Sequence, residues 1–229
     1  MTGTPPLLAD PLSELLRELD AAPDRRRVVG IAGVPGAGKS TLAGRLAEAV
    51  NIRHGRPVAM ALGMDGFHLS RAVLATFPDP RAALARRGAP WTFDPQGLAL
   101  RLRQLREASL ARAGPSIGWP GFDHGVGDPV PDALQAPPAV RLLLLEGLYL
   151  LHEGDGWDLR PLMDRCWFLD TPVEMALQWL ALRHRQAWGI DAEAAARRVA
   201  GNDRPNAHIV LQTMPRADAR VPLDAPCTS

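Results

Sequence analysis

Residues 33–41, with the sequence GVPGAGKST, contain the only lysine of this 229-residue chain. The spacing Gly33-x-x-x-x-Gly38-Lys39-Ser40 is the Walker A pattern. In such a loop, backbone N–H groups surround phosphate oxygens, the lysine contacts the β- and γ-phosphates, and the hydroxyl binds Mg²⁺. A compact ammonium suits this cradle better than the broad arginine fork. The predicted cofactors are therefore ATP and Mg²⁺. The predicted cofactor-binding residues are Gly33, Val34, Pro35, Gly36, Ala37, Gly38, Lys39, Ser40 and Thr41.

Two carboxylates come at or near the ends of apolar runs. Asp65 ends the run in residues 56–68, and Glu146 ends the run LLLLE within residues 140–151. Because the carboxyl ends of parallel strands border the ligand crevice of an open α/β sheet, both acids are candidates for chemistry. The alternative is a structural acid, since Asp and Glu also favour helix starts and loop ends.

Two arginines, Arg183 and Arg185, lie in the segment LALRHRQAWG. Phosphoryl transfer requires the charge of the γ-phosphate to be neutralised and water to be kept out, and arginines on a closing lid meet both needs. The alternative is a solvated arginine face, because cations are favoured near helix C-termini. We expect Arg183 and Arg185 to act on the triphosphate.

A Walker A loop serves switch GTPases, mechanical or regulatory ATPases and small-molecule kinases. Guanine-binding GTPases resemble one another in an Asn-Lys-x-Asp motif, for which this chain has no second lysine. We find no further signature motif of a motor or transporter ATPase. A kinase needs acids at strand ends and a basic lid, and both are present. A nucleotide-binding regulator without acceptor chemistry is the alternative.

The elements that must position these residues alternate between strands and helices. Apolar runs predict strands at 26–33, 56–68, 140–151, 165–170 and 207–213, and periodic segments predict helices at 10–22 and 40–53. A further helix should follow Thr171, with Pro172 and Glu174 completing a capping box. Near-continuous apolar strands that alternate with helices are typical of a parallel sheet covered on both faces. We therefore predict an α/β fold with a five-stranded parallel sheet.

One segment breaks this alternation. Residues 114–138 are crowded with glycine and proline, and we expect a long loop there. Its Trp119, Phe122, Asp123 and His124 favour a functional loop over a tolerated surface insertion.

The segments GVPGAGKST, MDGFH, RRGAPWTFD, PGFD and LLLLEGLYLL together resemble the phosphoribulokinase/uridine kinase family of P-loop kinases, over roughly residues 26–213. The sequence is most similar to a branch of bacterial kinases associated with fructose-transport operons and their fungal relatives. The resemblance implies a P-loop NTPase fold with strand order 2-3-1-4-5. It also implies that Asp65 is the base for the acceptor hydroxyl and that Glu146 orients Mg²⁺ or its water, beside Ser40.

We expect a single kinase domain over 1–229, with the core at 26–213, an acceptor-side loop at 114–138 and a lid region at 183–200. His68 lies three residues after Asp65 and is a candidate acceptor contact. By resemblance, four further residues and one histidine match positions that shape the acceptor pocket. They are Phe93, Asp94, Phe122, Asp123 and His124.

The expected reaction is transfer of the γ-phosphate of ATP to a hydroxyl of a small metabolite, a sugar or sugar-like acceptor. Uridine kinases resemble DSFY where this chain has DGFH, which argues against uridine or cytidine. A nucleoside kinase or a pantothenate-type kinase, whose family shows an Asp-Gly-Phe element, is the alternative.

The composition excludes other classes of partner. A net charge of +1 gives no electrostatic case for nucleic acid or an anionic membrane. There is no apolar stretch of membrane-spanning length and no secretory signal. Two cysteines, Cys166 and Cys227, are typical of a reducing compartment, so we expect a cytoplasmic protein. A homo-oligomer is left open.

Overall fold

A computed structural model describes residues 3–21, 24–108, 114–123 and 125–225. Its strands are β1 (Arg27–Ala32), β2 (Ala59–Gly63), β3 (Ile117–Asp123), β4 (Asp128–Ala136), β5 (Leu142–Gly147), β6 (Arg165–Asp170) and β7 (Ala219–Pro222). Its α-helices are α1 (Pro11–Asp20), α2 (Lys39–His54), α3 (Arg71–Leu74), α4 (Pro80–Ala85), α5 (Pro95–Glu107), α6 (Val173–Trp188), α7 (Ala192–Arg198) and α8 (Arg204–Thr213). Short helical turns are η1 (Met64–Phe67), η2 (Pro90–Thr92), η3 (Arg160–Leu162), η4 (Val199–Asp203, a π-helix) and η5 (Met214–Arg216).

The central sheet has five parallel strands in the order β2-β5-β1-β6-β7. Its first four strands along the chain lie within segments that the sequence predicts. The fifth was wrong: residues 207–213 belong to helix α8, and the last strand is β7. When only the strands of this sheet are numbered along the chain, their order is the expected 2-3-1-4-5. The labels differ because β3 and β4 take two numbers without joining this sheet.

Residues 114–138 were expected to be a loop, and this expectation was wrong. The segment folds into the antiparallel hairpin β3–β4, with an irregular register between Trp119 and Gly121. Both strands of a two-stranded ribbon are edges, so Pro129 and Pro131 in β4 do not interrupt a central ladder. The hairpin packs against η1, the turn that follows β2.

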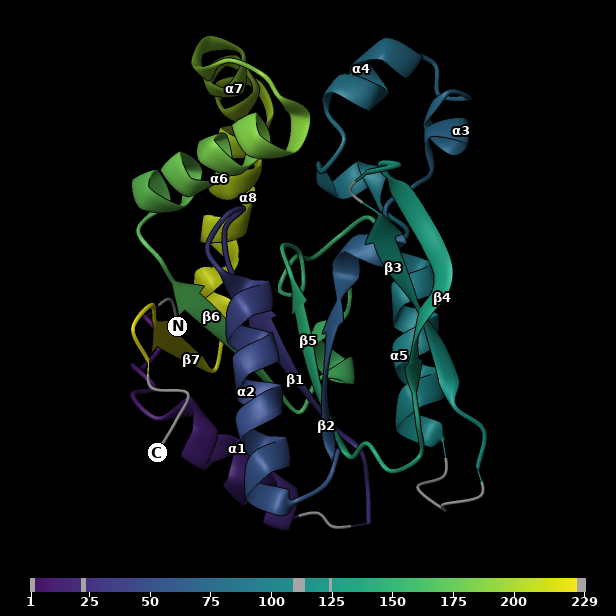
Figure 1. The fold of residues 1–229 in the computed structure, drawn as a ribbon, viewed down its shortest axis with the longest axis vertical. Helices are drawn as coiled ribbons and strands as arrows, with labels where there is room; N and C mark the ends of the chain where they lie inside the picture. Colours follow the sequence, from purple (N-terminus) through teal and green to yellow (C-terminus); the bar gives the residue numbers. More distant parts are fainter. Residues whose placement is uncertain (1–2, 22–23, 109–113, 124, 226–229) are drawn as a thin grey trace.

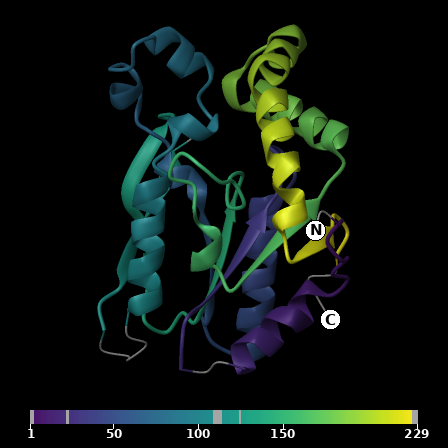
Figure 2. The same ribbon diagram turned by 180° about the vertical axis from the view of Figure 1, so that it is seen from behind.

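Some helices cover the faces of the sheet, and others lie beyond the carboxyl ends of its strands. Helix α2 covers the sheet face turned to the viewer in Figure 1, and α5 and α8 are seen in front in Figure 2. Helices α6 and α7 rise from the carboxyl ends of the strands on one side and α3 and α4 on the other, whereas α1 lies near the opposite end of the sheet (Figure 1). The site must lie at the carboxyl end of the sheet, between the α6–α7 side and the α3–α4 side.

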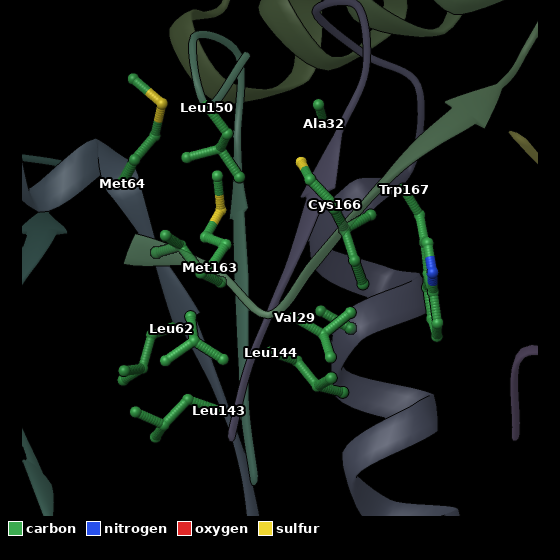
Figure 3. Packing of buried hydrophobic residues seen from close by; sticks show 14 of the residues in the cluster. Val29, Ala32, Leu62, Met64, Leu143, Leu144, Leu150, Met163, Cys166 and Trp167 are labelled. Carbon is green, nitrogen blue, oxygen red and sulfur yellow. The ribbon is translucent and has the colours of Figure 1, made fainter. Parts of the chain in front are cut away.

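The core is continuous through the sheet. The four leucines of β5 are fully buried, as are Val29, Cys166 and Trp167, and Met163, Cys166 and Leu150 meet beside Gly30 (Figure 3). Burial raises the pKa of Cys166 to about 12, so this thiol is inert core material. The core thus holds the strand ends rigidly in register, which fixes the residues that follow them.

Candidate active site

The Walker A residues form a loop between β1 and α2. Helix α2 begins at Lys39, and its N-cap Gly38 has φ 94°, with no side chain capping the first turn. The free N–H groups of a helix start are a ready anion site. Gly36 has φ 78°, and a Cβ there would lie 2.3 Å from the carbonyl oxygen of Ala176 in α6. The loop is therefore shaped for phosphate and packed directly under α6.

The junction between β6 and α6 also contacts this loop. Thr171 was expected to cap α6 with Glu174, and this was wrong, because the helix starts at Val173 without a side-chain cap. The Thr171 hydroxyl instead donates to the carbonyl oxygen of Ala37 at 2.9 Å, and Glu174 pairs with Arg204 at 2.6 Å. Thr171 thus ties the start of α6 to the phosphate loop.

Lys39 is buried beneath the loop. Its Nζ donates to the carbonyl oxygen of Val34 at 3.0 Å, and the residue is only 8% exposed. Burial lowers the pKa of Lys39, the carboxylates of Glu146 and Asp65 oppose this, and the Arg183 guanidinium lowers it further. Three charged side chains from different elements are therefore near the ammonium.

Glu146 faces the start of α2. The Ser40 hydroxyl donates to its Oε1 at 2.9 Å, and Glu146 lies level with Ile31 of β1 and Gly63 of β2. Burial raises the pKa of Glu146 and Asp65 raises it further, against the opposing effects of Lys39, Ser40 and Arg183. Mg²⁺ prefers oxygen ligands and often takes only one or two carboxylates, with phosphates and water completing its shell. The Ser40–Glu146 pair has the donor atoms for such an ion.

Asp65 lies in η1, directly after β2. The hairpin holds this turn: the Trp119 indole N–H donates to the carbonyl oxygen of Gly63 at 2.9 Å, and the Trp119 and Phe67 rings meet edge to face at 5.0 Å. A Cβ on Gly66 would lie 2.0 Å from the carbonyl oxygen of Pro120, so only glycine permits this contact. The hairpin therefore sets the position of Asp65.

Some of the predicted acceptor residues come together beside Asp65. The His68 ring lies 3.9 Å from that of Phe93 and 4.8 Å from that of Phe122, between centroids. Its Nδ1 is 2.8 Å from the carbonyl oxygen of Asp65. Together these rings form an aromatic wall next to the candidate base.

The other acceptor candidates have local structural contacts. The Asp94 carboxylate accepts from the N–H of Gly97 and caps α5. The Asp123 carboxylate accepts from the N–H groups of Gly125 and Val126 in the hairpin turn. His124 lies outside the described residues.

The two lid candidates differ in their surroundings. Arg183 and Arg185 both lie exposed on α6. Arg183 is close enough to shift the pKa values of Lys39 and Glu146, whereas Arg185 is not among the charges that do so. Of the two arginines, Arg183 is therefore the one whose charge acts on the pKa values of Lys39 and Glu146.

Several residues of this region were missed by the sequence analysis. Arg86 and Arg87 belong to the segment RRGAPWTFD, from which only Phe93 and Asp94 were selected. Arg87 donates to Asp128 at 2.7 Å and to the carbonyl of Leu69 at 2.8 Å, which joins the end of α4 to the hairpin. The motif was a usable signal, but these partners are distant in sequence.

The phosphoribulokinase/uridine kinase family model matches residues 28–226, from β1 to just past the last described residue. The chain belongs to this family. It shares 40% identity over 161 residues with an ATP-dependent kinase-like protein, notR', of Aspergillus versicolor, covering 69% of this chain and 93% of that protein. It shares 36% identity over 201 residues with a candidate uridine kinase of Schizosaccharomyces pombe, covering 85% and 82% of the two chains.

Solved structures of other kinases superpose on this chain. A candidate fructose transport system kinase from Silicibacter superposes with a TM-score of 0.80 at 33% identity, covering 91% of this chain and 96% of that one. A D-glycerate 3-kinase from Cryptococcus neoformans superposes with a TM-score of 0.65 at 12% identity, covering 94% of each chain, which shows the shared fold. The protein is therefore an ATP-dependent kinase with a small-molecule substrate. None of its helices within the described ranges has the length and apolar character to cross a membrane.

Proposed function

We propose that this kinase transfers the γ-phosphate of MgATP to a hydroxyl of a sugar or sugar-like metabolite, with Asp65 as the general base. One observation carries the proposal. Glu146 lies near the end of β5, the strand beside β1, and contacts Ser40, whereas Asp65 follows β2, the strand one place further out. Glu146 therefore suits a role on Mg²⁺ beside the nucleotide phosphates, and Asp65 suits a role on a second substrate.

In the proposed reaction, Asp65 accepts the proton of the acceptor hydroxyl as its oxygen bonds to the γ-phosphorus. The bond from the γ-phosphorus to the β–γ bridging oxygen breaks, and ADP leaves. Lys39 and Arg183 neutralise charge on the phosphates, and the loop N–H groups hold them in line. Ser40 and Glu146 would hold Mg²⁺, which supplies further charge neutralisation when bound.

The acceptor class is supported by the relatives and by the wall beside Asp65. One neighbour is named for fructose transport, another for D-glycerate, and a curated relative for uridine. His68 replaces the tyrosine expected in uridine kinases and is packed between Phe93 and Phe122. This favours a polyol over a pyrimidine nucleoside, and a nucleoside or a pantothenate-like compound is the alternative.

The substitution Asp65→Asn tests this assignment. It keeps the shape of the side chain but removes the proton-accepting charge, so acceptor phosphorylation should fall by about 10²–10⁴-fold. MgATP affinity should change by no more than a few-fold, because Asp65 is assigned to the acceptor. Calorimetry would measure MgATP binding. Turnover would be measured as ADP release in the presence of candidate acceptors: sugars, sugar acids, sugar phosphates, nucleosides and pantothenate.

Asp79→Asn is the matched control. The Asp79 carboxylate caps α4 by accepting from the N–H of Ala82 at 2.9 Å, and asparagine caps a helix equally well. Its turnover should equal that of the parent. If Asp65→Asn lost MgATP binding, the roles of Asp65 and Glu146 would have to be exchanged. If no acceptor stimulated the parent enzyme, acceptor chemistry itself would be wrong.

A further inference from the structure

Arg86 is a half-buried cation where the end of α4 meets the η4–α8 segment. It ends α4, and its guanidinium donates to the carbonyl oxygen of Gly201 at 2.8 Å and to Oδ1 of Asn206 at 3.2 Å. Both partners are neutral and lie in the η4–α8 segment. Arg86 makes no ion pair with any residue in the described ranges. A positive charge is thus held at this junction by neutral partners, without an ion pair.

The position of Arg86 is on the acceptor side of the site. Two residues further on, the carbonyl oxygen of Gly88 accepts from the Tyr149 hydroxyl at 2.6 Å. Tyr149 follows β5, three residues after Glu146. Burial raises the pKa of Tyr149, the charge of Arg86 opposes this, and the carboxylates of Asp203 and Asp65 raise it further. Arg86 and Asp65 are therefore both close enough to act on the Tyr149 hydroxyl, which follows the carboxyl end of β5.

The charged side chains next to Arg86 interact with other residues. Arg87 pairs with Asp128 at 2.7 Å. Asp203, the acid nearest in sequence to the partners of Arg86, lies 2.9 Å from His184 and is buried with it. Within the described residues no carboxylate forms an ion pair with Arg86, and a charge without an ion-pair partner in a partly desolvated place is costly.

A purely structural arginine of this chain looks different. Arg26 is 3% exposed and uses Nε, Nη1 and Nη2 on the carbonyl oxygens of Val140, Leu105 and Pro137. Arg86 donates one hydrogen bond from each Nη, is more exposed than Arg26, and lies toward the carboxyl end of the sheet. Arg86 therefore keeps donor capacity for a ligand, whereas Arg26 does not.

We propose that Arg86 binds an anionic group of the acceptor, so that the substrate is a hydroxy acid or a phosphorylated polyol. The arginine fork matches the paired oxygens of carboxylate and phosphate, and its bonds to Gly201 and Asn206 orient it. This inference rests on the proposed kinase function and narrows its acceptor class. Asp65 would then take the hydroxyl end of the acceptor and Arg86 the charged end.

The test compares matched acceptors in three charge forms: glycerol with glycerate and glycerol 3-phosphate, and ribose with ribonate and ribose 5-phosphate. The parent enzyme should prefer an anionic member of a series, and the carboxylate and phosphate arms identify which anion. Arg86→Met should raise KM for that anionic acceptor by about 10- to 100-fold, the effect of losing a charged hydrogen bond. KM for MgATP and for neutral acceptors should stay near the parent values.

Two further variants separate charge from tethering. Arg86→Lys loses the two-pronged tether to Gly201 and Asn206 but keeps the charge, so it should retain much of the anion preference. Arg81→Met removes an exposed arginine from the same helix and should match the parent. Equal loss for neutral and anionic acceptors, or a raised KM for MgATP alone, would make Arg86 a tether or a nucleotide ligand and overturn the proposal.

The two hypotheses fail in different ways. An enzyme that phosphorylates only neutral acceptors would keep the proposed kinase function and overturn the anion site. An enzyme stimulated by no acceptor in either panel would overturn the proposed acceptor chemistry, and the anion site with it.

Discussion

The Lys39 side chain is bent back under its own loop, with Nζ on the carbonyl oxygen of Val34 and little solvent access. A guanidinium is wider than an ammonium and requires a planar set of partners. We therefore predict that Lys39→Arg lowers turnover by about 100-fold or more, the usual cost of losing one well-placed phosphate donor. Steady-state turnover with saturating MgATP would measure this effect.

The control for this exchange lies on the same helix. Arg45 is an exposed residue of α2, and Arg45→Lys should leave turnover unchanged. Near-normal activity of Lys39→Arg would show that charge alone suffices at this position and that the argument for a compact ammonium is wrong.

At the scale of elements, α6 carries the two arginines assigned to the lid. We predict that Arg183→Ala lowers turnover by about 10³-fold, the lower end of the range for arginines that act on a transferring phosphoryl group. Arg185→Ala should have a smaller effect, because Arg183, and not Arg185, is among the charges that shift the pKa values of Lys39 and Glu146. Both side chains are exposed, so the free energy of unfolding should change by no more than about 0.5 kcal/mol.

Turnover and thermal melting of the two single variants and of the double variant would test this prediction. Arg185→Ala is the matched comparison for Arg183→Ala, since both side chains are exposed on the same helix. A large drop in melting temperature with unchanged turnover per folded molecule would show that α6 needs these arginines for stability and not for catalysis.

At the scale of the whole molecule, Asp164 joins separate elements at the amino ends of β1 and β6, away from the site. Its carboxylate accepts from the N–H of Val28 at 2.8 Å and from Arg25, Arg27 and Arg106 at 2.8–3.0 Å. Burial raises the pKa of Asp164, but the Val28 N–H and the three arginines outweigh burial, so the pKa is lowered overall.

This lowered pKa predicts how stability changes with pH. Above the ordinary value of 3.8, Asp164 is ionised in both states and its full stabilisation is present. Below that value the unfolded chain takes up a proton first, so stability falls until the folded pKa is passed. Asp164→Asn should lose about 3 kcal/mol at neutral pH and show a flatter decline in acid. Urea unfolding at a series of pH values would measure both effects.

Asp24→Asn is the control, because Asp24 is exposed and lies close to the same arginines in sequence. Its unfolding curve should follow that of the parent at every pH. An equally steep acid decline in Asp164→Asn would mean that other carboxylates account for the acid sensitivity.

The amino-acid sequence by itself determined the features that depend on near neighbours in the chain. The Walker A spacing places Lys39 at the start of a helix, and Asp10 caps α1 by accepting from the N–H of Ser13, as expected from Asp-Pro at a helix start. The apolar runs of β1, β5 and β6 are buried strands. These outcomes follow from contacts within a few residues and from burial of continuous apolar segments, which periodicity records directly.

Tertiary structure decided what depends on distant partners. Residues 207–213 form a helix because Ala207, Val210 and Thr213 are buried at a helical spacing, and a short apolar run cannot distinguish that from a strand. The hairpin within 114–138 exists because Trp119 and Pro120 pack on the turn that carries Asp65. The placement of Arg86 beside Gly201 and Asn206 joins segments more than a hundred residues apart. No local pattern encodes such contacts, because their stability comes from side chains that meet only when the sheet is assembled.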